Sequence, residues 1–262
     1  MPIGVSYAAL TPVPARKHAM SPIPWLPEHE ADAFPPVGRA LRDPDGLLAA
    51  GGDLSVERLL AAYARGIFPW FSAGEPILWW SPDPRMVFDT GAMHVPRRLR
   101  RWLRGCGWTI GADGAFAEVM QACAAPRAGQ GGTWIVPAMH AAYARLHAHG
   151  HAHSIEVRDG EALVGGLYGV AVGRMFFGES MFSRASGGSK VALLALAQVL
   201  RGWGWPLLDA QVRSAHLATL GARTMPRDRF VAAVRELAAL PGRPGPWTAT
   251  FPRLTGADLV AD

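Results

Sequence analysis

The sequence predicts an α+β protein with a mostly antiparallel sheet, on three observations. Residues 154–157, 162–167 and 168–177 are rich in β-forming residues and follow one another directly. Asp159-Gly160 supplies a tight hairpin turn after the first of them. An Ala- and Leu-rich helix over 190–201 and a short buried strand over 207–212 follow. Helices, a meander, a helix and a returning strand together indicate an α+β sheet domain.

Composition indicates a packed protein in the cytoplasm. Half of the 262 residues are apolar and only 18% are charged. The first twenty residues lack a secretory apolar core, and no stretch approaches the roughly 20 apolar residues that span a membrane. Two cysteines, Cys106 and Cys123, lie outside any CxxC pattern and are expected to be packing residues. The net charge of +5 weakly favours an anionic partner.

Three parts are expected along the chain. Residues 1–33, rich in Pro and Ala, read as a flexible N-terminal extension. Residues 34–85 form a small N-terminal domain, in which Ser55 caps a helix over 56–65. Residues 86–262 form the larger C-terminal domain.

An aromatic and proline-rich segment at 66–85 stands out in the N-terminal part. Its twenty residues hold three Trp, two Phe and four Pro. Proline fixes the backbone that carries these rings, so the segment is expected to be rigid. It is either a hydrophobic junction between sub-domains or the wall of a pocket for an apolar side chain or a nucleobase.

The C-terminal part is predicted to contain several further helices. Pro96 precedes a basic amphipathic helix over 97–104, and Asp113 is expected to cap a helix over 114–123. Other helices are expected over 137–150, 214–220 and 228–239. The basic helix is either a solvated face or a surface for nucleic-acid phosphates. Its cationic residues are Arg97, Arg98, Arg100, Arg101 and Arg104.

Asp209 and Gln211 are the first candidates for chemistry. They lie two residues apart on the predicted strand, a spacing that points both side chains to one face. They are either a satisfied core pair or an acceptor pair around an attacking amine. A neutral amide is a very poor base, so Gln211 would orient the amine or accept its proton within a polarised network.

Glu179 is the second candidate, because a carboxylate among Phe and Met residues is costly unless it has a partner. It either pairs with an arginine or receives a cationic protein N-terminus or side chain. On a regular strand, Phe177 and Glu179 would share one face, with Ser180 and Phe182 on the other. Trp70, Trp134, Phe177, Met181 and Phe182 are candidates for an apolar substrate pocket, with core packing as the alternative for each of them.

Two other patterns carry less weight. Arg184 to Lys190 form a glycine-containing turn before a helix, where backbone amides could hold an anion, as in acetyl-CoA transferases. Four alternating histidines at 147, 149, 151 and 153 suggest a metal site, but Gly150 is expected to break the helix between them. No metal is expected.

Eight sequence blocks carry a resemblance to a known family. They are GLLA at 46–49, GGDLS at 51–55, GIFPWF at 66–71, PILWWSPDPR at 76–85, GTWI at 132–135, GHAHSIEV at 150–157, FGESMFS at 177–183 and LDAQV at 208–212. In sequence and order they resemble the leucyl/phenylalanyl-tRNA–protein transferases, and the resemblance covers roughly residues 34–251. The paired glycines at 187 and 188 depart from that family, whose members are expected to lack them.

The resemblance implies an N-acetyltransferase-like catalytic domain and an aminoacyltransferase. Its substrates would be tRNA charged with Leu or Phe, with Met as a further candidate, and proteins with N-terminal Arg or Lys. The added residue marks the protein for degradation. The ester is already activated, so no cofactor is expected, and a monomer without membrane attachment is expected. Asp209 and Gln211 would lie at the reaction centre, and Ser180 would join the substrate-binding residues.

Trp70, Trp134 and Phe177 match positions that line the family's aminoacyl-adenosine site. Two other functions fit parts of the sequence. A CoA-dependent acetyltransferase would fit the fold class and the glycine loop. A tRNA-binding module without chemistry would fit the basic and aromatic residues.

Overall fold

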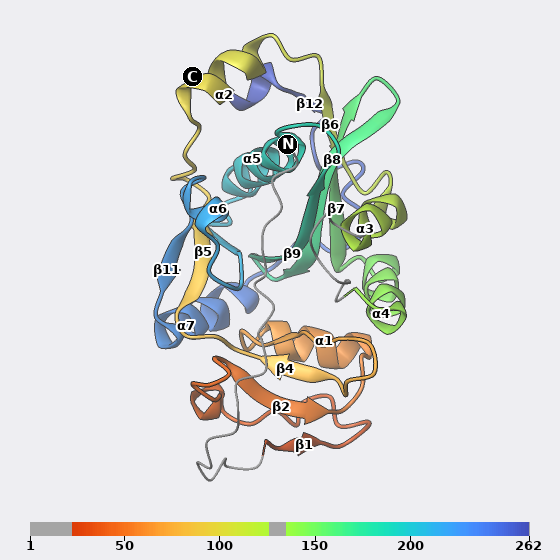
Figure 1. Ribbon diagram of the computed structural model, residues 1–262, viewed down its shortest axis with the longest axis vertical. Coiled ribbons are helices and arrows are strands. Elements are labelled where there is room, and N and C mark those ends of the chain that lie inside the picture. Colours follow the sequence, from red (N-terminus) through yellow and green to blue (C-terminus); the bar gives the residue numbers. More distant parts are fainter. Residues whose placement is uncertain (1–22, 126–134, 262) are drawn as a thin grey trace.

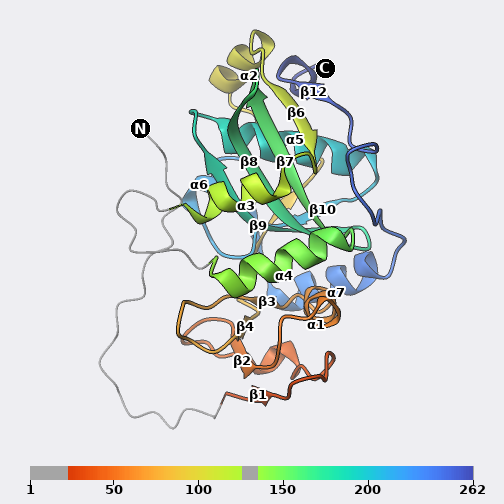
Figure 2. The same cartoon turned by 90° about the vertical axis from the view of Figure 1, so that its right-hand side faces the viewer.

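The computed structural model describes residues 23–125 and 135–261, which fold around two sheets. A four-stranded sheet in the N-terminal part has the order β1-β2-β4-β3. Its strands are β1 (Trp25–Leu26), β2 (Leu47–Gly51), β3 (Phe68–Pro69) and β4 (Leu78–Trp80). Helix α1 (Val56–Tyr63) lies between this sheet and the rest of the molecule (Figures 1 and 2).

An eight-stranded sheet dominates the C-terminal part, in the order β11-β5-β10-β9-β8-β7-β6-β12. Only the β10–β9 pair is parallel, which confirms the predicted α+β class with a mostly antiparallel sheet. The strands are β5 (Arg85–Asp89), β6 (Thr109–Ala112), β7 (Ala152–Asp159), β8 (Ala162–Val172), β9 (Met175–Ser183), β10 (Leu207–Asp209), β11 (Arg223–Met225) and β12 (Leu254–Thr255).

Helices cover both faces of this sheet (Figure 1). Helix α5 (Gly188–Gly202) packs on one face, and α3 (Phe116–Ala124) and α4 (Pro137–Ala148) pack on the other. The remaining helices are α2 (Arg97–Arg104), α6 (Ala215–Ala218), α7 (Arg227–Ala238) and the 3-10 turns Val37–Arg39 and Ala257–Leu259. Two apolar clusters result, one under α5 and one shared by α3, α4 and the N-terminal sheet.

Most predicted elements are present, and the local interactions expected to stabilise them are observed. The Ser55 hydroxyl accepts the backbone N–H of Arg58, which caps α1 as expected. Pro137 occupies the first turn of α4, where its missing N–H costs nothing. Among the described residues, none of the helices has the length and apolar character to cross a bilayer.

The predicted capping role of Asp113 is wrong. Asp113 has a positive φ of 59°, and α3 begins three residues later at Phe116. Its carboxylate instead accepts hydrogen bonds from His153 Nδ1 at 2.8 Å, from the backbone N–H of Ser154 at 2.9 Å and from that of Trp247 at 2.7 Å. Asp113 therefore joins β7 to the C-terminal segment.

Candidate functional site

Arg85 and Asp209 form a buried ion pair at the start of the candidate site. Arg85 opens β5 and Asp209 ends β10, and these neighbouring strands bring the two side chains together. Arg85 donates from Nε to Asp209 Oδ1 at 2.8 Å and from Nη2 to Oδ2 at 2.6 Å, and both side chains are fully buried. The rings of Phe68 and Phe230 lie 4.7 and 4.6 Å from the guanidinium carbon. Asp209 therefore remains a paired carboxylate rather than a free base.

Gln211 reaches the site by a different route from the one predicted. Strand β10 ends at Asp209, and Gln211 has a positive φ of 59°, so the expectation of a continuous strand to residue 212 is wrong. The backbone N–H of Gln211 donates to Asp209 Oδ1 at 2.8 Å, which holds this turn. Its side-chain Nε2 then donates to Glu179 Oε1 at 2.8 Å. A left-handed turn, rather than strand alternation, brings the two candidates to one site.

Glu179 lies at a β-bulge in β9. Tyr168 pairs with Ser180 and Gly169 pairs with Gly178, which leaves Glu179 as the extra residue. The bulge shifts the alternation by one, so Phe177 and Phe182 pack into the same apolar cluster while Met181 packs against the other. The prediction that Phe177 and Phe182 occupy opposite faces is therefore wrong.

Two tyrosines, rather than an arginine, hold the Glu179 carboxyl. Tyr63 from α1 donates to Oε1 at 2.7 Å and Tyr143 from α4 donates to Oε2 at 2.8 Å. The two tyrosine oxygens also lie 2.5 Å apart. If both hydroxyl hydrogens point to Glu179, none remains for the contact between the two tyrosine oxygens. All three contacts can be hydrogen bonds if the Glu179 carboxyl carries a proton and one tyrosine accepts from it rather than donating to it.

The environment of Glu179 also favours a protonated carboxyl. Burial, which disfavours the charged form, raises the pKa of Glu179 to about 7, although the tyrosine hydrogen bonds act in the opposite direction. Burial and the nearby Glu179 carboxylate also raise the pKa values of Tyr63 and Tyr143 well above 10, so both tyrosines keep their protons. The site therefore contains a carboxyl group that exchanges a proton near neutral pH.

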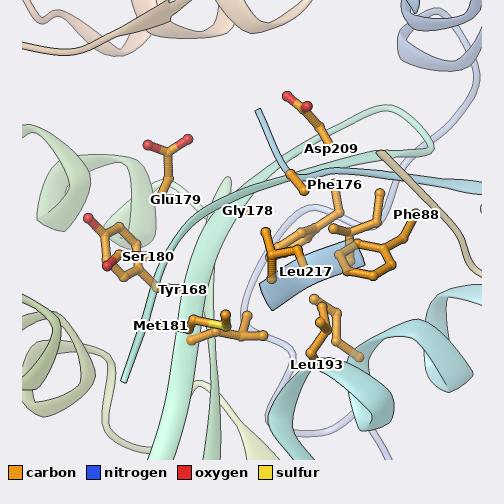
Figure 3. Close-up of a pocket in the computed structure, with 14 residues that line it drawn as sticks. Phe88, Tyr168, Phe176, Gly178, Glu179, Ser180, Met181, Leu193, Asp209 and Leu217 are labelled. Atoms are coloured by element: carbon orange, nitrogen blue, oxygen red, sulfur yellow. The ribbon is translucent and has the colours of Figure 1, made fainter. Parts of the chain in front are cut away.

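An apolar cavity of about 60 Å³ is lined in part by residues Glu179 and Asp209. In Figure 3 the carboxyl groups of Glu179 and Asp209 point away from the apolar side chains of Met181, Leu193 and Leu217. Three of the predicted substrate-binding residues, Glu179, Ser180 and Met181, line the cavity. Sequence reasoning missed most of its other apolar lining residues, which include Phe88, Leu167, Phe176, Leu193, Leu196, Leu208 and Leu217.

The other predicted pocket residues lie elsewhere. Phe177 and Phe182 are buried, and Phe177 packs 5.1 Å from the Tyr63 ring, away from the cavity lining. Trp70 is half-buried beside Trp80, with ring centroids 5.4 Å apart. Trp134 lies outside the described residues. The roles assigned to these four residues stay predictions.

The basic helix does not present all of its arginines to one surface. Arg97, Arg98, Arg101 and Arg104 are exposed on α2. Arg98 lines a groove with Arg184 and Lys190, whereas Arg100 lines a separate depression with Arg201. These side chains remain candidates for tRNA contacts.

The histidines have ordinary partners. His147 Nδ1 contacts the carbonyl of Ala152, and His149 Nδ1 contacts that of Arg145, both at 2.8 Å. His153 is bound to Asp113. Within 23–125 and 135–261, no group of three or more His, Cys, Asp or Glu side chains could hold a metal.

Comparisons with known proteins agree with the resemblance. The family described as "Leucyl/phenylalanyl-tRNA protein transferase" matches residues 87–235, and its N-terminal domain matches residues 52–83. A "Leucyl/phenylalanyl-tRNA--protein transferase" from Xanthomonas campestris pv. campestris (strain B100) is 61% identical over 89% of this chain and 92% of its own. One from Xylella fastidiosa (strain M23) is 53% identical over 94% of this chain and 99% of its own.

A solved structure, of L-PGS from Bacillus licheniformis, is 11% identical with a TM-score of 0.35, over 58% of this chain and 50% of that one. That likeness is too weak to bear on function. The matches in sequence span both the N-terminal and the C-terminal parts of the chain. The chain belongs to the leucyl/phenylalanyl-tRNA protein transferase family and is a transferase enzyme.

Proposed function

We propose that this enzyme transfers Leu or Phe, with Met as a further donor, from aminoacyl-tRNA to the N-terminal Arg or Lys of acceptor proteins. The observation that carries the proposal is the apolar cavity, which is lined in part by residues Glu179 and Asp209 and which an apolar side chain of the donor would fill. The names of the relatives, which cite leucyl- and phenylalanyl-tRNA, support this assignment.

The donor side chain would occupy the cavity between Met181, Leu193 and Leu217. Apolar pockets select by size and shape, at about 1–3 kcal/mol per methylene. Unbranched and γ-branched side chains are expected to be used well, and β-branched ones poorly. Trp70, Trp134 and Phe177 are proposed to contact the terminal adenosine.

The acceptor amine would attack the ester carbonyl carbon beside Gln211. A C–N bond forms, the bond from the carbonyl carbon to the ribose oxygen breaks, and one proton passes from the amine to that oxygen. Glu179 fixes the Gln211 amide through Nε2, which leaves the amide oxygen to orient the amine. Asp209, with both oxygens held by Arg85, positions the Gln211 turn. Catalysis then rests mostly on positioning.

The product would carry a new N-terminal Leu or Phe that marks it for degradation in the cytoplasm. Charged tRNA would be held in part by the arginines of α2. The enzyme is proposed to act as a monomer, without a metal, nucleotide or CoA cofactor.

The decisive experiment is transfer of labelled Leu from charged tRNA to a model protein that begins with Arg. A matched protein that begins with Glu is the control, and acetyl-CoA replaces charged tRNA in a third reaction. Labelling of the Arg-initiated protein alone is expected. Acyl transfer from acetyl-CoA would favour an acetyltransferase instead, and tRNA binding without transfer would favour a binding module.

A further inference from the structure

A basic groove of about 770 Å³ lies between α2 and the segment that joins β9 to α5. Arg98 and Trp102 of α2 line one side, and Arg184 and Lys190 line the other, with His216 of α6 nearby. No Asp or Glu belongs to the described lining. The groove is therefore an electropositive surface.

The cationic side chains of the groove remain available to bind an anion. Among the described residues, no ion pair involves Arg98, Arg184 or Lys190. Arg184 makes one hydrogen bond, to the carbonyl of Leu163 at 3.2 Å. Burial, and secondarily the charge of Lys190, lowers the pKa of His216. An anion in the groove would relieve this concentration of positive charge.

An aromatic ring accompanies the charges. Trp102 is 41% exposed, which is unusual for a large apolar residue of this protein. Its ring stands edge-on to Trp108, with centroids 4.7 Å apart, and this contact fixes its orientation. Basic grooves with exposed aromatic rings are typical of single-stranded nucleic-acid sites, where phosphates meet cations and bases stack on rings.

The groove and the donor cavity lie next to each other along three elements. On α5, Lys190 lines the groove and Leu193, one turn later, lines the cavity. On α6, His216 lines the groove and its neighbour Leu217 lines the cavity. On β9, Ser183 lines the groove and Met181 lines the cavity. A ligand with its apolar end in the cavity therefore has the groove beside it.

The glycines at the entrance of α5 have a packing role. The N–H of Gly188 donates to the carbonyl of Ala185 at 3.1 Å, and that of Ser189 donates to Ser183 Oγ at 2.8 Å. A Cβ on Gly188 would lie 2.5 Å from the carbonyl oxygen of Val164 on β8. Side chains, rather than backbone amides, therefore make this groove attractive to anions.

We propose that the groove binds the unpaired 3′ end of charged tRNA, with phosphates at Arg184 and Lys190 and a base on Trp102. This inference rests on the proposed function, since it places the nucleotides that precede the aminoacylated one. It adds Trp102, Arg184 and Lys190 to the tRNA-binding residues.

The test compares two double variants of equal charge change. Arg184→Gln with Lys190→Gln removes the groove cations, and Arg229→Gln with Arg235→Gln removes two exposed cations on α7. We expect only the first to flatten the plot of log affinity for tRNA against log salt, by about 0.7 for each phosphate that the variant no longer neutralises. Trp102→Ala is expected to weaken binding roughly tenfold.

A second measurement separates binding from folding. In the groove variant, kcat/KM should fall more with charged tRNA than with a 3′-aminoacyl adenosine, which has no phosphates. Equal losses with both donors, or salt plots parallel to those of the parent, would overturn the inference. If only the groove variant flattens the salt plot but the parent transfers nothing, the proposed function fails while the groove assignment stands.

Discussion

Arg85 holds both carboxylate oxygens of Asp209, at 2.8 and 2.6 Å, and neither side chain is exposed to solvent. The same guanidinium donates to the carbonyl of Gly66, at the start of the aromatic-proline segment. The pair therefore joins the N-terminal unit to the β5–β10 edge of the large sheet. It links folding to the position of Gln211, because Asp209 also accepts the Gln211 backbone N–H.

Asp209→Ala is expected to destabilise the protein by about 3–5 kcal/mol, because it leaves the buried Arg85 charge without a partner. Urea unfolding measures this loss, and transfer should be assayed at a temperature where the variant is folded. Arg85→Met combined with Asp209→Leu is the matched control, and it should be less destabilised than Asp209→Ala. An unchanged unfolding midpoint for Asp209→Ala would contradict the buried pair.

Glu179→Gln is expected to flatten the pH dependence of stability. The folded pKa of Glu179, about 7, lies above its ordinary value of 4.5, so its contribution to stability is greatest below pH 4.5 and is lost as pH rises toward and through 7. A glutamine imitates the protonated carboxyl, since its NH₂ group can donate while its oxygen accepts. Unfolding free energies between pH 5 and 8 measure the change.

Glu156 is the control for this experiment, because burial also raises its pKa to about 7. Glu156→Gln should remove a similar part of the pH dependence of stability while leaving transfer largely intact, since Glu156 lies outside the cavity lining. Glu179→Gln should lower transfer as well. A pH profile of stability for Glu179→Gln that matches the parent would contradict the assigned protonation.

Changes at Leu193 are expected to alter the choice of amino acid. Leu193 lines the cavity and is almost fully buried. Leu193→Phe should reduce kcat/KM for Phe more than for Leu, by about tenfold, because the space of one methylene is worth about 1–3 kcal/mol. Leu193→Ala should shift the Phe/Leu ratio the other way. Equal ratios in both folded variants would show that the donor side chain binds elsewhere.

The sequence predicted the elements of this fold better than the details of its site. The helices around Ser55 and Pro137 and the hairpin at Asp159-Gly160 follow from local signals, because caps, turns and periodicity depend on neighbouring residues. Asp209, Gln211 and Glu179 were found as candidates. Their geometry depended on a bulge and a left-handed turn, which no periodic pattern reveals.

The partners of these residues lie far away in the sequence. Tyr63 and Tyr143, which bind Glu179, are 116 and 36 residues from it, and Arg85 is 124 residues from Asp209. In the sequence, Tyr63 indicated only the apolar face of a helix and not a hydrogen bond to Glu179. Arg85 ended the aromatic-proline segment, and an arginine partner was considered for Glu179 rather than for Asp209.

Gly188→Ala is expected to destabilise the protein much more than Gly202→Ala, although both glycines belong to α5. At position 188 the new Cβ would lie 2.5 Å from the Val164 carbonyl oxygen and 2.8 Å from Gly165 Cα, which is closer than real Cβ contacts. Backbone cannot move aside as a flexible side chain can, so the entrance of α5 must shift away from β8. Gly202 meets nothing within 4 Å, and alanine there should stabilise the helix by up to about 1 kcal/mol. Thermal melts of the two variants, with the parent beside them, give the comparison, and similar melting temperatures for both would show that α5 and β8 are not in the close contact that makes Gly188 necessary.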